Sequence, residues 1–535
     1  MGVEQVKDGN EKKKVARRAG IVGVFTLISR ILGYIRDAVL ANVFGASGVY
    51  DAFIVAQTIP NLLRRLVAEG SLVIAFVPIL AAERDRAGRE AMRDFTGAVL
   101  GILLPLLIVL SATGMLFPDA AVKLFAAGFD PERFDTATRL TRIMMPYIFF
   151  ISLVALAGGI LNTENFFAAP AAAPILLNFS IVTAAVLFRD YFEQEILAVA
   201  WGVLFGGVLQ LLLQVPYLLK VGMLVAPRWA PRNQALLLLG RRMLPAVFGV
   251  AVYQLNILVI RQLGSFLPPG QLTWYYNGTR LQEFALGVFA VSVSVAALPT
   301  LSEHAAKKDW NALRATYRQA LRITNFITIP TTIGLWIVAE PVVAVLFRHG
   351  QFTDNDAVQT ARLLQILILA LVPIGAVRVT VPTFYALGDT KTPVYAAGAS
   401  LLTTLGLGLF LVESYEIRGL TAAISVAALV QLVALIFWLS RRLRSEISSS
   451  SSEQPKDQSI FAHGCKCVFA VMPSAILVYF AQGTVDWLTA SKPFGAGALA
   501  VMGAVAGIVY VVLARILSIE DANLLIGVVK RRLGR

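Results

Sequence analysis

Residues 51–80 read DAFIVAQTIPNLLRRLVAEGSLVIAFVPIL, a stretch in which a short charged motif interrupts two apolar runs. The charges are Arg64, Arg65 and Glu69. A charge at the centre of a bilayer costs about 2.5–3.5 kcal/mol on insertion scales, so membrane proteins keep such residues beside a partner, at an interface or in a wet cavity. Which of these applies depends on how the rest of the chain meets the membrane.

The composition is typical of an all-α polytopic membrane protein. Of the 535 residues, 57% are hydrophobic and only 15% are charged, and the mean hydropathy is +0.71. About fourteen apolar runs reach the roughly 20 residues that a spanning helix needs. The second run is too long for one straight crossing, which predicts a break near Gly70 or a cytoplasmic extension. The expected spans are 17–42, 48–81, 94–117, 138–161, 169–188, 196–219, 242–266, 272–301, 321–340, 357–387, 393–412, 418–440, 461–481 and 494–517.

The basic residues fall in alternate loops, which predicts the orientation of the chain. Both ends of the chain and segments such as ERDRAGREAMR and KKDWNALRATYRQALR are basic, whereas VFGASG, FRDYFEQE, GSFLPPGQ and ESYEIRG are nearly free of Lys and Arg. Lys and Arg accumulate in cytoplasmic loops, so we expect both termini in the cytoplasm. The same sidedness explains the net charge of +14 without a nucleic-acid partner. The first apolar segment is long and contains Arg30, which disfavours a cleaved signal peptide.

Two halves of the chain resemble each other. LFAAGFDPERFDTATRL resembles LFRHGQFTDNDAVQTARL at an offset of 222 residues, and AFVPILAAERD recurs as AALPTLSEHAA. The loops have the same order and sidedness in both copies, which predicts parallel repeats with a substrate cavity at their interface, as in transporters. The predicted parts are an N-lobe of residues 1–222, a C-lobe of residues 223–444, a Ser-rich cytoplasmic linker of residues 445–460, and two extra helices with a basic tail, residues 461–535.

Charged residues inside the first span are candidates for that cavity. Arg30 lies near mid-depth, and an ion pair with Asp37, seven residues later on the same helix face, is the alternative. Arg36 lies roughly 120° around the helix from Arg30, so it could line the cavity or extend toward the outer surface.

Further charges occupy the later spans. Arg64 and Arg65 would be interface anchors if their helix ended at residue 66, but the apolar run resumes at once, which favours a place inside the helix. Arg280 and Glu283 lie in the eighth span, where an i,i+3 pair within one helix is the alternative. Arg378 adds a cation in the tenth span. The planar fork of arginine binds phosphate oxygens bidentately, so these arginines suggest a phosphate-bearing substrate.

Six stretches carry a resemblance to a known family. They are SRILGYIRD, DAFIVAQTIPNLLRRLVAEG, AFVPIL, GILNTENFFAAPAAAPILLN, LPTLSEHAAKKD and FYALGDTKTP. In this order, and over essentially the whole chain, the sequence resembles the MurJ (MviN) family of bacterial lipid II flippases, in the multidrug/oligosaccharidyl-lipid/polysaccharide exporter superfamily. The resemblance implies a cationic cavity between two lobes and a groove from the last two helices for an undecaprenyl tail. The substrate-binding residues that it implies are Arg30, Arg36, Asp51, Arg64, Arg65, Glu69, Arg280, Glu283 and Arg378.

The function expected from this resemblance is transfer of lipid II, the undecaprenyl-pyrophosphate-linked peptidoglycan precursor, to the outer leaflet of the bacterial inner membrane by alternating access. The sequence contains no Walker A loop, which disfavours ATP hydrolysis by this chain. A membrane potential favours outward movement of an anion by about 2.3 kcal/mol per charge per 100 mV. We expect a monomer in contact with membrane lipids, able to associate with the cell wall synthesis machinery, with no cofactor.

Two alternatives stay open. An exporter of drugs or of another polyprenyl-linked saccharide would share the repeat, but the arginine-rich first lobe and the two extra helices disfavour it. An enzyme acting on polyprenyl-linked sugars would need catalytic carboxylates or a metal site, yet the loops are short and the histidines are only His304, His349 and His463. The HGCKC segment lacks the four-ligand spacing of a structural zinc site. The sequence therefore predicts a transporter rather than an enzyme.

Overall fold

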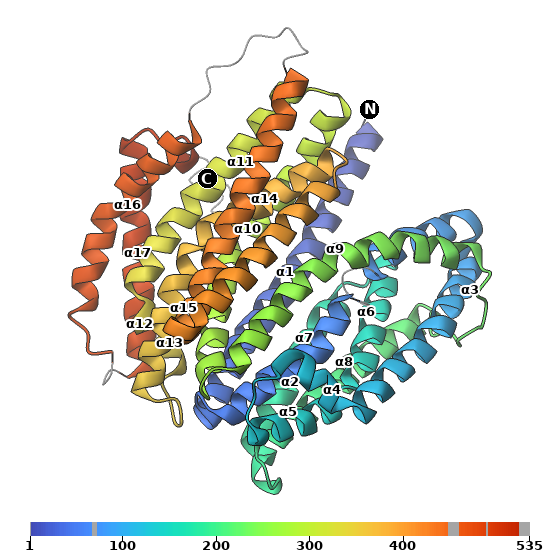
Figure 1. Cartoon of the computed structure of the whole chain (residues 1–535). Helices are drawn as coiled ribbons and strands as arrows, with labels where there is room; N and C mark the ends of the chain where they lie inside the picture. Colours follow the sequence, from blue (N-terminus) through green and yellow to red (C-terminus); the bar gives the residue numbers. More distant parts are fainter. Residues whose placement is uncertain (1, 67–71, 448–458, 488–490, 524–535) are drawn as a thin grey trace. The chain divides into compact units, whose positions relative to one another are not determined.

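The computed structural model describes residues 2–66, 72–447, 459–487 and 491–523. Over these ranges the chain forms helices joined by short turns and contains no β-strand (Figure 1). Among the described residues, six helices are long and apolar enough to cross a membrane, or up to nine if each of three bent pairs counts as one span. The structure confirms an all-α architecture with membrane-spanning helices, and the number of about fourteen spans stays a prediction.

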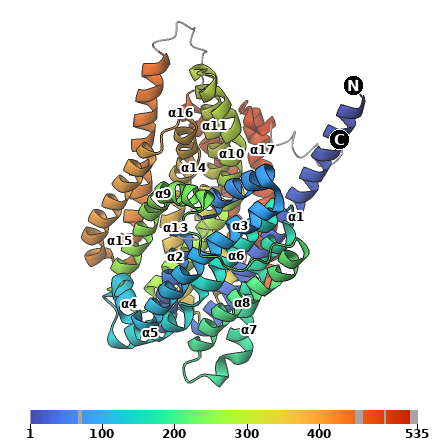
Figure 2. The same ribbon diagram turned by 90° about the vertical axis from the view of Figure 1, so that its right-hand side faces the viewer.

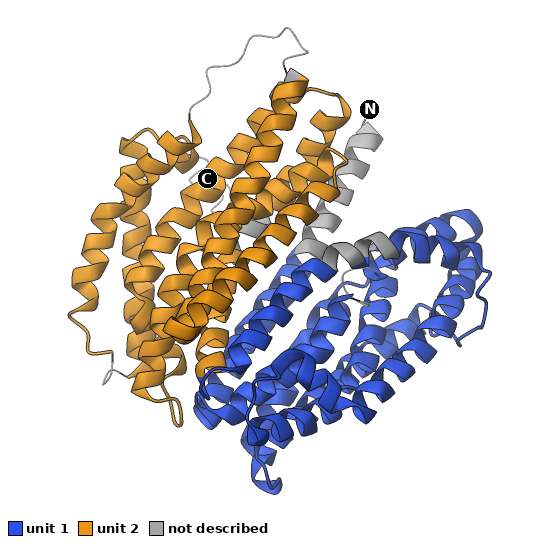
Figure 3. Ribbon diagram, viewed as in Figure 1, with its two compact units in different colours: residues 1–270 blue, residues 271–535 orange. Residues whose placement is uncertain are grey.

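Contacts divide the chain into two compact units, residues 1–270 and 271–535 (Figure 3). Lipid offers the backbone no hydrogen-bond partners, so each apolar run folds as a helix that pairs its own N–H and C=O groups. Unit 1 contains α1 (Gly2–Phe44), α2 (Gly48–Arg64), α3 (Val73–Leu116), α4 (Pro118–Ala126), α5 (Pro131–Met144), α6 (Tyr147–Thr163), α7 (Ala168–Thr183), η2 (Ala184–Phe188), η3 (Arg189–Tyr191), α8 (Ile196–Lys220) and α9 (Gln234–Ser265). Unit 2 contains α10 (Gln271–Ala306), α11 (Trp310–Ile337), α12 (Ala339–Phe347), α13 (Asp354–Leu369), α14 (Leu371–Ala386), α15 (Lys391–Ile447), α16 (Ile460–Gln482) and α17 (Lys492–Ile516).

The second predicted span, 48–81, is not one uninterrupted α-helix. Helix α2 ends at Arg64, and Arg65 is its C-cap residue. Gly70, near which the sequence predicts a break, lies outside the described residues. Helix α3 runs on through the predicted loop after residue 81 and changes direction at Gly88, whose φ of +74° glycine adopts without a steric penalty. Residues 65, 66 and 72 are π-helical and residues 67–71 lie outside the described part of the chain, so the expectation that no clean helix end falls at Arg64 stays a prediction.

Each unit contains the same short series of elements. A nine-residue helix, α4 in unit 1 and α12 in unit 2, is followed by a bent pair: α5 and α6 meet at 41°, and α13 and α14 meet at 42°. Pro146 and Pro373 lie at these bends. Because proline has no N–H for the i−4 carbonyl and its ring clashes with the preceding turn, a helix kinks there. The series follows the sequence repeat, while the parallel arrangement of the two halves stays a prediction.

Small residues bring α7 and α8 close together, as Figure 2 shows within unit 1. A Cβ atom at Gly202 would lie 2.7 Å from the Ala184 Cβ atom, and one at Gly206 would lie 2.7 Å from Leu177 Cδ1. The Ser180 hydroxyl donates a hydrogen bond to the Gly202 carbonyl at 2.8 Å. In lipid, apolar side chains gain little free energy by packing against one another. Helices are therefore held together by close backbone approach and by interhelical hydrogen bonds.

The segment between α8 and α9 lies across α3 in a notch made by two glycines. The Arg228 N–H donates to the Gly97 carbonyl at 2.8 Å, and a Cβ atom at Gly101 would lie 2.1 Å from the Arg228 carbonyl oxygen. Helix α9 then packs against α3 and α4. By sequence α9 is the first helix of the predicted C-lobe, which starts at residue 223, but by contacts it is part of unit 1. The lobe limits themselves stay a prediction.

Candidate functional site

The last turns of α1 hold a buried ion pair. Arg36 Nη2 lies 2.7 Å from Asp37 Oδ1, and Arg36 Nη1 donates to Asn178 Oδ1 on α7 at 3.1 Å. The Asn178 amide donates in turn to the Ser29 carbonyl at 3.1 Å. Arg36 is 8% exposed and Asp37 is 0% exposed. Asp37 thus pairs with its neighbour, and the alternative of an Arg30–Asp37 pair was wrong. Arg36 lies between α1 and α7 and does not extend outward.

Arg30, six residues earlier on α1, is in a different environment. Its side chain is exposed. Six residues correspond to about 600°, or 120° around the helix, so Arg30 points away from the α7 contact that buries Arg36. Among the described residues, no acceptor lies within hydrogen-bond or ion-pair distance of its guanidinium. An exposed arginine of this kind keeps all five N–H donors for a ligand.

Asp51, in the first turn of α2, is bound by the chain itself. Its side chain is 0% exposed, and Asp51 Oδ2 accepts the Gly270 N–H at 2.6 Å. Gly270 has φ +89°, and a Cβ atom there would lie 2.4 Å from the Ala46 carbonyl oxygen. Only glycine allows the backbone at residue 270 to come this close to Ala46, so the turn after α9 packs directly against the turn between α1 and α2.

Further contacts join the end of α9 to the rest of unit 1. Arg133 Nη1 donates to the Leu267 carbonyl at 3.1 Å, and the Gly128 N–H donates to Ser265 Oγ at 3.0 Å. Asp130 caps α5 by accepting the Arg133 N–H at 2.9 Å and also pairs with the Arg133 guanidinium. The hydrogen bond from the Arg133 N–H holds the pKa of Asp130 below its usual value; burial opposes this shift, and the Arg133 side chain supports it. The contacts of Asp51 and Arg133 together form a lock, which we call the α9 lock.

Arg64 and Arg65 lie at the end of α2, and both are half-buried. The Arg65 N–H reaches the carbonyls of Asn61 and Leu62, which closes the last turn. No acceptor for the Arg65 side chain is found among the described residues. Glu69 lies outside the described residues. Residues 65 and 66 continue α2 as a π-helical turn, so the interface-anchor alternative stays open, and a charge-conserving substitution is needed to separate it from substrate binding.

In unit 2 the predicted residues lie on α10 and α14, which pack together. Arg280 Nη1 lies 3.3 Å from Glu283 Oε2, which confirms the i,i+3 pair within α10. The Arg280 guanidinium also lies 5.8 Å from the centre of the Tyr276 ring. Arg378 on α14 is half-buried, and among the described residues its side chain has no acceptor. The two units are each described by themselves, so a common site for their arginines stays a prediction.

The Arg378 carbonyl shows how α14 is held beside α10. Pro382, four residues later, has no N–H to donate to this carbonyl. Ser294 Oγ on α10 donates to it instead, at 2.6 Å. Sequence reasoning missed Ser294, as it missed Asn178. The available signals were a proline four residues after a charged residue and an asparagine inside the apolar run APILLNFSIV.

The described side chains of these helices include groups that can bind an anion. Within the described ranges, no three His, Cys, Asp or Glu side chains gather as a metal site. His304 lies in the last turn of α10, and His349 contacts Lys492. What the helices do present is a set of guanidinium groups, which bind phosphate oxygens through paired N–H donors.

Known proteins match this chain over most of its length. A family model described as lipid II flippase MurJ matches residues 40–497. A probable lipid II flippase MurJ of Buchnera aphidicola subsp. Acyrthosiphon pisum is 36% identical over 440 residues, 81% of this chain and 84% of that protein. The lipid II flippase MurJ of Burkholderia cenocepacia is 38% identical over 427 residues, 79% of this chain and 83% of that protein.

Solved structures agree with the sequence matches. A lipid II flippase MurJ in an inward closed conformation has a TM-score of 0.76 and 26% identity, covering 96% of this chain and 99% of that chain. An inward-facing MATE family transporter of the MOP superfamily shares the fold, with a TM-score of 0.69 and 15% identity over 79% of this chain and 96% of that chain. The resemblance carried by the six sequence stretches is confirmed. This chain belongs to the MurJ family of lipid II flippases.

Proposed function

We propose that this chain moves lipid II from the cytoplasmic to the outer leaflet of the bacterial inner membrane, as a step of peptidoglycan synthesis. The observation that carries the proposal is the family match over residues 40–497, supported by relatives named as lipid II flippases. The charge pattern agrees with it, because the substrate's pyrophosphate needs cationic partners in a low-dielectric environment.

The arginines that have no acceptor in the described part of the chain are the best candidates for the pyrophosphate. Arg30, Arg65 and Arg378 each offer a guanidinium to which no described residue is bound. A hydrogen bond to a charged group is worth about 1.5–3 kcal/mol, so two or three such contacts suffice to select a pyrophosphate lipid over a neutral one. Arg36 and Asp51 are already bound within unit 1, and we assign them to the framework of this conformation.

The mechanism we propose is alternating access without covalent chemistry. The headgroup binds from the cytoplasmic side, the two lobes rock, and the headgroup leaves on the outer side, while the polyprenyl tail stays in lipid. Release of the α9 lock would be part of this motion. The chain has no Walker A loop, and a potential negative inside favours outward transfer of an anionic headgroup by about 2.3 kcal/mol per charge per 100 mV.

Substrate identity can be tested with the purified chain in vesicles. Fluorescent lipid II placed in one leaflet should reach the other leaflet with its structure unchanged, whereas a cationic drug should not accumulate. Drug accumulation without lipid II transfer would favour a multidrug exporter, whose fold this chain shares. Chemical cleavage of lipid II would favour an enzyme.

Orientation has its own test. A cysteine placed in residues 264–271 should react with an impermeant thiol reagent added outside the cell, and one placed in residues 307–314 should not, because basic loops stay in the cytoplasm. The native thiols Cys465 and Cys467 are first replaced by serine and alanine, respectively. The reverse labelling pattern would overturn the proposed topology.

A further inference from the structure

The segment between α8 and α9, residues 221–233, contains no helix or strand, yet the chain holds both of its ends. At its start, Val221 and Met223 are buried in a hydrophobic cluster that includes residues of α3 and α6. At its end, the Asn233 side chain caps α9 by accepting the Leu236 N–H at 3.1 Å. The segment is therefore an ordered connection between the two helices.

The middle of the segment packs against α3 at the glycine notch. A Cβ atom at Gly97 would lie 3.1 Å from the Ala226 carbonyl oxygen, and one at Gly101 would lie 3.2 Å from the Trp229 backbone nitrogen. A side chain at Gly101 would push the segment away from the helix. Because the Arg228 N–H also binds the Gly97 carbonyl, the backbone of residues 226–229 has a fixed place along α3.

This place along α3 gives the depth of the segment in the membrane. The charged part of α3 ends at Asp94, and residues 95–110 contain no Asp, Glu, Lys or Arg. Helix α8 ends at Lys220, and both α3 and α8 are long and apolar enough to cross a membrane. Gly97 and Gly101 lie in the first turns of the apolar part of α3. The segment therefore lies at the border between the hydrocarbon and the headgroups.

The side chains that the segment presents at this depth are an indole and two guanidinium groups. Trp229 is 74% exposed, and the side chain of Arg228 is 66% exposed. Arg232 is exposed as well, and no acceptor for its side chain is found among the described residues. Tryptophan prefers the membrane–water interface because its ring is amphipathic, and guanidinium groups bind phosphate oxygens in pairs.

The charge of the segment favours a negatively charged headgroup over a neutral one. Residues 220–242 contain no Asp or Glu, and their basic residues are Lys220, Arg228, Arg232, Arg241 and Arg242. The nearby carboxylate of Asp94 pairs with Arg228 and offsets one of these charges, so a net positive charge is left. A basic segment next to a spanning helix is attracted to a membrane surface that contains anionic lipids.

We propose that Arg228, Trp229 and Arg232 form a binding site for the headgroups of anionic phospholipids in the cytoplasmic leaflet, which we call the α8–α9 site. In this site Arg232, together with Arg228, binds the phosphodiester, and the Trp229 ring lies at the level of the glycerol. The notch on α3 holds the three residues in place before the lipid arrives. The choice of leaflet rests on the proposed orientation of the chain, whereas the lipid class does not depend on the proposed substrate.

The first test compares two lipids at Trp229 and needs no substrate. The purified chain is placed in phosphatidylcholine vesicles that contain equal small fractions of brominated phosphatidylglycerol or brominated phosphatidylcholine, since bromine quenches the fluorescence of a nearby tryptophan. The contribution of Trp229 is the difference between the wild type and Trp229→Phe. Phosphatidylglycerol should quench it with an apparent affinity about 10-fold higher than phosphatidylcholine, because two arginines attract its net negative headgroup.

Variants then assign this preference to the two arginines. The preference should fall to about threefold in Arg232→Gln and disappear in Arg228→Gln/Arg232→Gln. Arg232 binds none of the described residues, so its replacement should leave the fold of the segment intact. Arg86→Gln is the matched control, because Arg86 is an exposed arginine in the charged part of α3 and pairs with Glu83. This variant should keep the wild-type preference.

Three results would overturn the α8–α9 site. Equal quenching by the two lipids in the wild type would remove it, as would a full preference in Arg228→Gln/Arg232→Gln. Loss of the preference on addition of inorganic phosphate at constant ionic strength would mean a site for soluble phosphate instead. A wild type that prefers phosphatidylglycerol but transfers no lipid II would keep the α8–α9 site and lose the proposed function.

Discussion

Two regions of unit 1 contain similar charged residues, but these residues differ in whether other residues of the chain bind them. Where α1 meets α2, Arg36 is bound by Asp37 and Asn178, and Asp51 is bound by the Gly270 N–H. Farther along the same helices, toward the middle of α1 and the other end of α2, Arg30 and Arg65 have no acceptor among the described residues. A charge within an apolar run is therefore an incomplete sign of a binding site. What distinguishes the two regions is whether a described residue already binds the charged group.

Unit 2 repeats the contrast on neighbouring helices. Arg280 pairs with Glu283 and lies over Tyr276, while Arg378 has no acceptor within the described part of the chain. The difference predicts that substitutions of bound charges act mainly on stability or conformation. Substitutions of the arginines without an acceptor should act mainly on transport.

The largest effect is expected at Arg30. Arg30→Ala should abolish lipid II transfer and leave membrane insertion and thermal stability close to wild type, because an exposed arginine contributes little to packing. The measurement is rescue of a bacterial strain depleted of its own flippase, with the amount of protein in the membrane determined in parallel. Full rescue by Arg30→Ala would remove Arg30 from the binding site and break the comparison.

The next effect concerns the geometry of the guanidinium groups of Arg64 and Arg65 at the end of α2. If Arg64 and Arg65 are interface anchors, Arg64→Lys/Arg65→Lys should be nearly silent, because lysine also reaches the interface. If they bind pyrophosphate, losing the bidentate fork should lower lipid II affinity about 10- to 100-fold, which corresponds to about 1.5–3 kcal/mol. Our account predicts the loss. The check is lipid II binding at matched protein levels, beside Arg64→Ala/Arg65→Ala. Wild-type binding by the lysine pair, with poor insertion of the alanine pair, would mean anchors.

Asp51 should behave in the opposite way. Asp51→Ala leaves the buried Gly270 N–H without its acceptor, which costs about 1–3 kcal/mol of stability in this conformation. Thermal unfolding in detergent should therefore occur at a lower temperature, while the affinity of the folded protein for the lipid II headgroup should change less than in the Arg64→Lys/Arg65→Lys variant. A normal unfolding temperature combined with lost headgroup binding would place Asp51 among the substrate ligands instead.

The smallest effect is a pH dependence of the α9 lock. Because the pKa of Asp130 is lowered in the folded chain, its contribution to stability is present above the unfolded value of about 4 and is lost as the pH falls through the folded value. Wild type should be more stable than Asp130→Asn at neutral pH, and the two unfolding curves should converge below about pH 4. A difference that stays constant as the pH falls well below about 4 would show that Asp130 acts only as a neutral cap.

The sequence predicted the helices better than their partners. Hydropathy located most of the long helices because a bilayer imposes length and apolarity on every crossing segment. It gave no sign of the change from α-helix to π-helix after Arg64, at residues 65 and 66. The bond between Arg36 and Asn178 joins residues 142 positions apart, and no local pattern encodes such a pairing.

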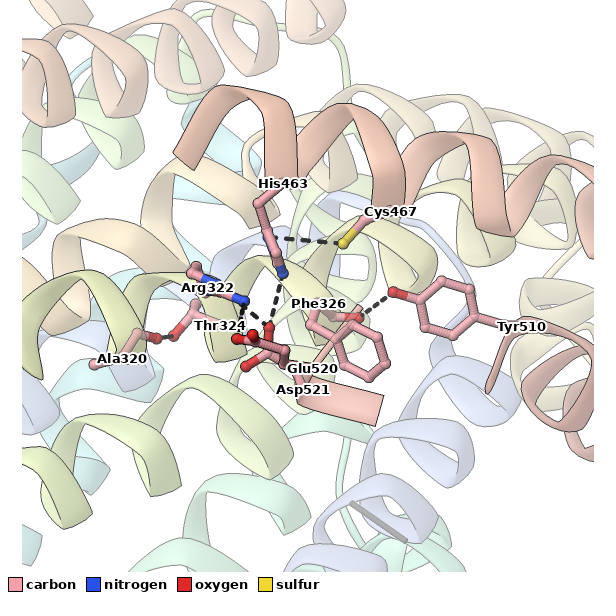
Figure 4. A network of polar contacts seen from close by, with 9 residues as sticks. All are labelled: Ala320, Arg322, Thr324, Phe326, His463, Cys467, Tyr510, Glu520 and Asp521. Carbon is pink, nitrogen blue, oxygen red and sulfur yellow. Dashed lines mark hydrogen bonds and ion pairs between the residues drawn. The ribbon is translucent and has the colours of Figure 1, made fainter. Parts of the chain in front are cut away.

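The placement of α9 was equally hidden. The Arg228 backbone packs into the notch at Gly97 and Gly101. This contact depends on the shape of the two backbones, which the residue types alone indicate only weakly. The sequence around His463 lacks the spacing of a zinc site, and its partner in the structure is Asp521, which lies 58 residues away (Figure 4). Periodicity reports which side of a helix is apolar, whereas these contacts depend on which helix comes next to it.

We propose that this chain carries lipid II with arginines that have no acceptor among the described residues. The most direct measurement is transfer of fluorescent lipid II between the leaflets of vesicles that contain only the purified chain, compared for wild type, Arg30→Gln and Asp51→Asn. We predict transfer of intact lipid II by wild type, a loss of at least about 100-fold in Arg30→Gln, corresponding to about 2.8 kcal/mol, and a smaller loss in Asp51→Asn. Absence of transfer by wild type, or equal transfer by wild type and Arg30→Gln, would contradict the account.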